Sequence, residues 1–216
     1  MSNNSIDIAG IRKDYMLAEL NEDLAGNEPV LFFKQWFGEA EAAQISEINA
    51  MTLATVDDQN RPHARIVLLK GLEEGGFVFF TNYDSDKGLE IRGNPNVALT
   101  FFWKELERQV RIEGIATKIP ETDSDIYFNS RPAGSRIGAW ASPQSREIPH
   151  RHVIELNYQK YQEEFSQIEI PRPPHWGGYL VTPVSMEFWQ GRSSRMHDRI
   201  LFTQKGNIWV KSRLAP

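Results

Sequence analysis

The chain has 216 residues and a formal net charge of −5, from 24 Lys and Arg against 29 Asp and Glu, and it contains no cysteine. The absence of cysteine excludes disulfides, zinc–cysteine sites, iron–sulfur clusters and a thiol nucleophile. Because 40% of the residues are hydrophobic and 25% are charged, the composition is that of a globular protein. The mild acidity argues against a general polyanion binder, so nucleic acid is not an expected partner.

No segment approaches the run of roughly 18 apolar residues that a membrane helix needs. The first residues also lack the basic stretch and apolar core of a signal peptide. We therefore expect a cytoplasmic protein with no membrane partner. The length fits one large domain or two small ones, and we expect a polar N-terminal arm over residues 1–28 and a single domain over 29–216.

The N-terminal part of the chain predicts helices. Apolar residues scattered through a polar segment predict a helix around 8–20, ending before Gly26 and Pro29. Apolar residues at helical spacing predict a second, amphipathic helix over 30–44.

From residue 50 the pattern changes to short β-type runs separated by turn residues. The first predicted strands cover 51–56, 63–70, 76–81, 96–103 and 106–119, and the last ones cover 177–183, 185–190, 199–204 and 207–212. Between them we expect a short helix at 86–93 and a helical block over 121–166 that prolines interrupt. Successive strands without long intervening helices indicate a mainly β fold, with a barrel core of about six to nine strands and peripheral helices.

The usual catalytic motifs are missing. The chain has no G-x-G-x-x-G after a strand, no P-loop, no G-x-S-x-G and no H-E-x-x-H. Of the five histidines only His150 and His152 lie close together in the sequence, and we interpret this pair as part of a solvated helix start. No metal is expected.

Basic side chains form four groups. Arg65 and Lys70 bracket an apolar strand, which is also the ordinary arrangement of a strand with solvated ends. Residues 81–87 join a strand to a helix start and would suit a phosphate, although, taken alone, they are better explained by an ordinary N-cap at Ser85. The third group suits a phosphomonoester and comprises Tyr127, Arg131, Ser135 and Arg136.

The fourth group lies in the hairpin 189–199, which carries Arg192, Arg195, His197 and Arg199. Residues 185–216 hold six basic and two acidic side chains, a net charge of +4, so the rest of the chain carries −9. Such a concentration of positive charge favours a loop that binds a small anion.

These groups belong to an ordered series of motifs: RIVLLK at 65–70, FFTN at 79–82, LERQVR at 106–111, SRP at 130–132, IGAW at 137–140, QS at 144–145, EFWQG at 187–191, HDR at 197–199 and RLAP at 213–216. From Ile11 to Pro216 the series resembles the pyridoxamine 5′-phosphate oxidases, FMN enzymes of vitamin B6 metabolism. The resemblance implies an FMN-binding split β-barrel and a homodimer with FMN at the interface. It also implies oxidation of pyridoxine or pyridoxamine 5′-phosphate to pyridoxal 5′-phosphate, with O2 as acceptor and H2O2 as product.

The resemblance also implies site residues. The FMN contacts would be Arg65, Ile66, Val67, Leu68, Leu69, Lys70, Phe80, Thr81, Lys87, Gln109, Gln144, Ser145, Trp189 and Arg199. The substrate contacts would be Arg12, Tyr15, Lys70, Tyr127, Arg131, Ser135, Arg195 and His197. In this assignment Arg12 and Tyr15 belong to the arm that closes over the substrate.

Three residues receive a role in the chemistry. Arg199 would lie near the N1–C2=O edge of the flavin, and Arg195 over the pyridine face of the substrate. His197 would hydrogen-bond the substrate or help its deprotonation. Arg65 and Lys70, five residues apart in one strand, would face opposite sides and serve one phosphate each.

The chain departs from the family at two positions. Asp86 stands where the family usually has Arg, and an acidic residue beside the FMN phosphate should weaken cofactor binding unless its side chain turns outward. Phe80 stands where the family often has Tyr, which removes one hydroxyl.

Two other functions stay open. One is a related split-barrel flavin oxidase that acts on another ring, such as those of phenazine biosynthesis; the presence of the complete phosphate cluster argues against it. The other is a non-catalytic protein that binds FMN or pyridoxal phosphate, and it would form no peroxide.

Overall fold

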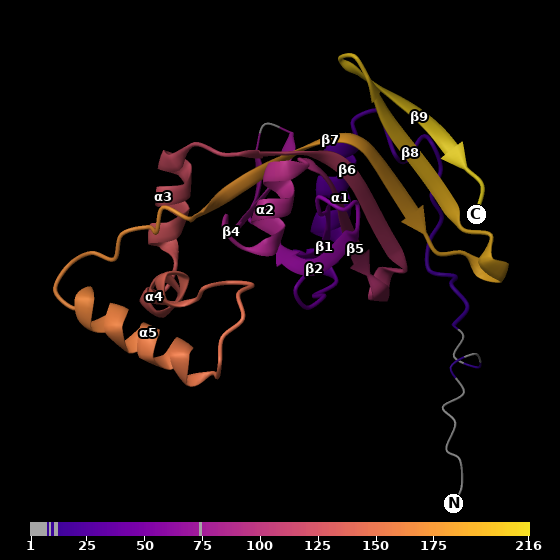
Figure 1. The fold of residues 1–216 in the computed structure, drawn as a ribbon. Coiled ribbons are helices and arrows are strands. Elements are labelled where there is room, and N and C mark those ends of the chain that lie inside the picture. Colours follow the sequence, from indigo (N-terminus) through magenta and orange to yellow (C-terminus); the bar gives the residue numbers. More distant parts are fainter. Residues whose placement is uncertain (1–7, 9, 11–12, 74) are drawn as a thin grey trace, which may run out of the picture. The chain divides into compact units, whose positions relative to one another are not determined.

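The computed structural model describes residues 8, 10, 13–73 and 75–216. Within these residues it has nine strands and five α-helices (Figure 1), which confirms the mainly β fold with peripheral helices. The order of the paired strands is β2-β1-β5-β6-β7-β4-β3, with β8 on β7 and β9 on β8. Contacts divide the chain into a first unit, Met1–Ile48, Phe102–Arg111 and Ser185–Pro216, and a second unit, Asn49–Phe101 and Ile112–Val184.

The second unit contains most of the sheet. Its elements are β1 (Ala50–Val56), β2 (Pro62–Leu68), β3 (Gly71–Glu73), β4 (Gly76–Asn82), α2 (Asp86–Gly93), β5 (Asn96–Trp103), β6 (Arg108–Lys118), α3 (Glu121–Ser130), α4 (Ala133–Ala141), α5 (His152–Glu164) and β7 (Trp176–Gln190), of which β5, β6 and β7 extend beyond the unit's bounds. Burial alternates along β1, so one face of the strand packs into the core. The core includes Leu53, Phe77 and Leu99, all fully buried.

The first unit is built on an aromatic core. It holds α1 (Pro29–Ala42) and the hairpin of β8 (Asp198–Lys205) and β9 (Ile208–Leu214), drawn in yellow (Figure 1). The buried face of α1 includes Phe32 and Trp36, whose rings lie 4.6 and 5.3 Å from that of Phe188. This packing explains the helical spacing of the apolar residues in this segment.

The structure corrects three predicted elements. Residues 13–20 form no helix, because the amides of Met16, Leu17 and Leu20 donate to the carboxylates of Glu107 and Asp198 instead of to their own chain. Residues 9, 11 and 12 of the predicted helix lie outside the described residues. The two strands expected on either side of residue 184 are one strand, β7.

The third correction concerns the strand expected at 63–70. β2 ends at Leu68, and Lys70 follows it, donating its amide to the carbonyl of Val78. Arg65 and Lys70 therefore do not belong to one regular strand, and the alternation argument that separated them is wrong. The helical block over 121–166 resolves into α3, α4 and α5.

Two predicted helices agree with the structure, and the predicted domain division is not tested by it. The helices at 30–44 and 86–93 are confirmed as α1 and α2. No described helix is long and apolar enough to cross a membrane. The division into an arm over 1–28 and a domain over 29–216 stays a prediction.

Candidate functional site

A cavity of about 500 Å³ in the second unit collects most of the predicted contacts of that unit. Its lining comprises Ile66, Val67, Leu68, Lys70, Phe80, Thr81, Asn82, Lys87, Tyr127, Arg131, Pro132, Ser135, Gln144 and Trp176. These residues come from β2, β4, β7, α2, α3, α4 and the loops between them. The fold therefore brings residues from both predicted phosphate-binding clusters, 81–87 and 127–136, to one cavity.

One wall of this cavity is an aromatic stack. The ring of Phe80 lies 3.9 Å from Tyr127 and 5.4 Å from Trp176, with the ring planes within 16° of parallel. The guanidinium of Arg131 lies over Trp176, 4.6 Å from the ring centroid. The sequence did not single out Trp176, because only the pairing of β4 with β7 brings it to Phe80. The stack gives the cavity a flat, rigid apolar surface.

Arg131 reaches this cavity because of the proline that follows it. A residue before proline is disfavoured in the helical region, so α3 ends and Arg131 adopts an extended conformation, with ψ of 149°. Its Nη1 and the Nε of Arg136 are buried and have no hydrogen-bond partner among the described residues. Burial lowers the pKa of Arg131, and the Tyr127 ring partly offsets this. Buried donors of this kind fit a dianionic phosphate, which supplies acceptors in pairs.

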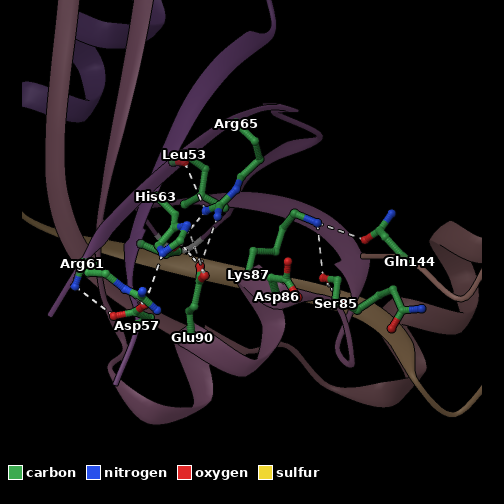
Figure 2. A network of polar contacts seen from close by, with 12 residues as sticks. Leu53, Asp57, Arg61, His63, Arg65, Ser85, Asp86, Lys87, Glu90 and Gln144 are labelled. Carbon is green, nitrogen blue, oxygen red and sulfur yellow. Dashed lines mark hydrogen bonds and ion pairs between the residues drawn. The ribbon is translucent and has the colours of Figure 1, made fainter. Parts of the chain in front are cut away.

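The start of α2 forms the second basic group of the cavity. Lys87 Nζ donates to Gln144 Oε1 at 2.9 Å and to Ser85 Oγ at 3.2 Å (Figure 2). Thr81 Oγ1 donates to the same amide oxygen at 3.3 Å. Ser85 is the N-cap residue of α2, as predicted, but its hydroxyl donates to the carbonyl of Asn82 and makes no side-chain cap bond. Burial, and secondarily Arg65, lowers the pKa of Lys87. These groups fit an anion held at a helix N-terminus.

Arg65 is held beside this group by acidic and hydroxyl partners. Its guanidinium pairs with Glu90 of α2 at 3.1 Å and donates to Thr55 Oγ1 (Figure 2). His63 lies 3.9 Å from Glu90 and 3.3 Å from Asp57, which continues the network along the same surface. Glu90 could not be predicted from the sequence, because nothing in the local pattern connects it with Arg65, 25 residues away.

The negative charge of Asp86 is paired with the neighbouring Arg146. Its side chain is 60% exposed and pairs with Arg146 Nη1 at 3.6 Å, while Arg146 Nη2 donates to the carbonyl of Asp84. An acidic residue in the first turn of a helix also interacts favourably with the helix dipole. The second departure, Phe80, contributes its ring to the aromatic stack, so the missing hydroxyl does not remove this residue from the cavity wall.

The first unit has its own cavity of about 700 Å³, lined by Lys13, Asp14, Tyr15, Arg192, Ser194, Arg195 and His197. The ring of Trp189 lies 4.6 Å from His197 and 5.8 Å, edge-on, from Tyr15. Ser194 and Arg195 both have positive φ, 54° and 62°, in the loop that carries them. The structure thus brings the predicted residues Tyr15, Arg195 and His197 together.

The protonation of His197 follows from a backbone contact. The amide of Arg192 donates to His197 Nδ1 at 3.1 Å. A backbone N–H can only donate, so Nδ1 is unprotonated and the neutral ring carries its proton on Nε2. His197 therefore presents a hydrogen-bond donor on the side away from Arg192.

Arg199 is held by the buried carboxylate of Glu187, a partner that the sequence did not indicate. Its Nε pairs with Glu187 at 2.8 Å, and its Nη1 donates to the carbonyl of Ala215 at 2.9 Å. Glu187 also pairs with Arg111 at 3.2 Å. The hydrogen bond to Glu187 raises the pKa of Arg199. The pair fixes where the Arg199 charge lies.

Several predicted contacts line neither cavity: Arg65, Leu69, Gln109, Ser145, Trp189 and Arg199. Leu69 is buried and donates its amide to Asn49, and Ser145, with φ of 66°, follows the cavity residue Gln144. Gln109, Trp189 and Arg199 lie in the first unit. Arg12 lies outside the described residues.

The strand pairing fits a split-barrel protein, and each of the two cavities is lined by basic side chains. Residues 37–164 match the family described as pyridoxamine 5′-phosphate oxidase, and residues 176–216 match the pyridoxine 5′-phosphate oxidase C-terminal dimerisation region. The chain belongs to the pyridoxine/pyridoxamine 5′-phosphate oxidase family, and the predicted resemblance is confirmed.

Relatives and solved structures agree with this family. A pyridoxine/pyridoxamine 5′-phosphate oxidase of Polaromonas sp. is 57% identical over 217 residues, all of both chains. One from Leptospira interrogans is 54% identical over 97% of this chain and 98% of its own. The crystal structure of PhzG from Burkholderia lata, in complex with tetrahydrophenazine-1-carboxylic acid, superposes with a TM-score of 0.86 at 28% identity, covering 93% of this chain and 99% of the other. That likeness confirms the split-barrel fold.

Proposed function

We propose that this chain catalyses the FMN-dependent oxidation of pyridoxine 5′-phosphate or pyridoxamine 5′-phosphate to pyridoxal 5′-phosphate. The alcohol and O2 give the aldehyde and H2O2; the amine, O2 and water give the aldehyde, ammonia and H2O2. The observation that carries the proposal is the half-buried Arg131, with a buried Nη1 that has no hydrogen-bond partner among the described residues, beside the Phe80–Tyr127–Trp176 stack and in one cavity with Lys87. Relatives that are more than half identical over the whole chain bear the name of this oxidase.

In this proposal two groups of residues bind one phosphate each. Lys87, Thr81 and the start of α2 would hold the FMN phosphate, with Arg65 adding a positive charge that Glu90 orients. Lys70, Arg131 and Ser135, with the Tyr127 hydroxyl, would hold the substrate phosphate. FMN, when bound, supplies the acceptor for the hydride and returns the electrons to O2. The chain's own contribution is binding and orientation.

The residues of the first unit would act on the substrate ring. Arg195 would lie over the pyridine face, with Tyr15 closing the cavity. Because Nδ1 of His197 accepts the amide of Arg192, the neutral tautomer carries its proton on Nε2, and we assign His197 as a hydrogen-bond donor to the substrate. Arg199, oriented by Glu187, would place its positive charge at the N1–C2=O edge of the flavin.

We further propose a homodimer with FMN at the interface. Residues 176–216 match a region described as a dimerisation region. Ile66 is 65% exposed and Leu68 is also exposed, although both line the cavity of the second unit. A second copy would cover this apolar surface. The cytoplasmic location stays a prediction.

Peroxide formation separates the enzyme from its alternatives. FMN-loaded protein mixed with pyridoxine 5′-phosphate in air should produce H2O2 and pyridoxal 5′-phosphate in equal amounts. FMN-loaded protein that forms no peroxide would favour a non-catalytic carrier. Oxidation of a reduced phenazine precursor at a higher kcat/KM than pyridoxine 5′-phosphate would favour the related ring oxidase.

Replacing Asp86 by alanine should change the Kd for FMN by less than about threefold at physiological salt. Asp86 is largely exposed and paired with Arg146, and exposed ion pairs contribute only about 0.2–1 kcal/mol. Fluorescence titration of FMN measures this Kd, with Arg92→Ala as a surface-charge control because its pair with Asp84 is also exposed. A tenfold tightening in Asp86→Ala would show that Asp86 acts on the phosphate.

A further inference from the structure

Glu107 is a buried acidic residue to which the proposed chemistry gives no role. It follows the short 3-10 helix Lys104–Leu106, is 5% exposed and has φ of 55°. A left-handed conformation is unfavourable for a residue other than glycine and persists where surrounding contacts hold it. The contacts of Glu107 connect two segments of the first unit.

The carboxylate of Glu107 holds the N-terminal arm. Its Oε2 accepts the amides of Met16 at 2.9 Å and Leu17 at 3.1 Å, and its Oε1 pairs with Lys13 at 3.2 Å. Burial raises the pKa of Glu107, but the hydrogen bonds from Leu17, Lys13 and Met16 outweigh it and leave the pKa below its ordinary value. The carboxylate is therefore ionised at neutral pH and bonded to the arm on both oxygens.

The backbone of Glu107 holds the loop that carries the site residues. Its carbonyl accepts the amide of Gly191 at 2.7 Å and the side-chain amide of Gln190 at 3.3 Å. Gly191 is also where Tyr15 packs, because a Cβ on Gly191 would lie 2.7 Å from the Cγ of Tyr15. One residue thus fixes both the arm on either side of Tyr15 and the backbone against which Tyr15 lies.

We propose that Glu107 is a positioning residue that holds residues 13–17 in place, so that Tyr15 closes the cavity of Arg195 and His197. The inference rests on the proposed function for the role of that cavity. Glu107 lines neither the cavity of Arg195 and His197 nor the proposed phosphate cavity. Its loss should release the arm, raise KM for the substrate and leave FMN affinity unchanged.

Amide hydrogen exchange tests the contact without any turnover. In the protein without substrate, the amides of Met16 and Leu17 should be protected, and Glu107→Gln should accelerate their exchange about tenfold or more, since bonds to charged groups are the strong ones. Glu105→Gln removes an exposed charge two residues away and should leave both amides protected. Unchanged exchange in Glu107→Gln would overturn the proposal. If that variant fails to fold, Glu107→Asp, which withdraws the carboxylate by one methylene, should show the same acceleration.

A double-mutant cycle tests whether Glu107 acts through Tyr15. Glu107→Gln and Tyr15→Ala should each raise KM for pyridoxamine 5′-phosphate, and the double variant should have the KM of Tyr15→Ala alone. Two effects that multiply in the double variant would contradict action through Tyr15. A wild-type protein without turnover would refute the proposed function, whereas the exchange result would still decide whether Glu107 holds the arm.

Discussion

Arg131→Ala is expected to raise KM for pyridoxamine 5′-phosphate by about 30- to 1000-fold and to leave FMN bound. The substitution removes a charge-assisted hydrogen-bond partner of the phosphate, and such a loss costs roughly 2–4 kcal/mol. Arg131 has a buried Nη1 without a hydrogen-bond partner among the described residues and lies on Trp176, so its guanidinium is held ready for an anion. Steady-state kinetics over a range of substrate concentrations measures the effect.

The matched variants separate charge from shape. Arg131→Lys keeps the charge but loses the planar fork and its stacking on Trp176, so KM should lie between the wild-type and alanine values. Phosphate binding is shared by ground state and transition state, so kcat should change less than KM. A KM within threefold of wild type in Arg131→Ala would remove Arg131 from the substrate site.

Lys87→Met should weaken FMN binding by about 10- to 100-fold while keeping the apolar length of the side chain. Lys87 lies at the start of α2, and its ammonium already donates to Gln144 and Ser85. Losing a charge-assisted bond to a phosphate costs about 1.5–3 kcal/mol. Fluorescence titration at fixed ionic strength gives the Kd.

The same variant should change the pH dependence of FMN binding. Burial and Arg65 lower the pKa of Lys87, and only its protonated form attracts a phosphate. Affinity should therefore fall as pH rises through the lowered pKa, and bound phosphate should raise that pKa. Lys87→Met should lose this dependence. If the variant keeps the alkaline fall in affinity, another group is responsible for it.

The basic and hydroxyl residues of the cavity could be singled out from the sequence. Lys87, Arg131 and Ser135 were predicted from their local groups and from the family motifs, and the fold brings them to one cavity. Three carboxylates that hold other parts of the structure in place were missed. Glu90, Glu107 and Glu187 contact basic or amide groups between 12 and 91 residues away, and such pairings depend on strand order that no local pattern shows.

Most strands were predictable from short β-type runs bounded by turn residues, whereas the conformation of the arm was not. Apolar residues in 8–20 suggested a helix, yet the amides of Met16, Leu17 and Leu20 donate to the side chains of Glu107 and Asp198. Helix propensity is a weak preference that distant hydrogen bonds override. The hydrogen bonds to these carboxylates replace helical ones in the arm, and the arm they hold carries Tyr15, which lies beside Trp189.

Anaerobic titration of the FMN-loaded protein with pyridoxamine 5′-phosphate tests the proposed function most directly. The visible flavin absorption should bleach on addition of substrate and return when air is admitted, with pyridoxal 5′-phosphate formed in proportion to the flavin reduced. Inorganic phosphate at the same concentration should leave the spectrum unchanged. A flavin spectrum that stays oxidised with saturating pyridoxamine 5′-phosphate and pyridoxine 5′-phosphate would contradict the oxidase function.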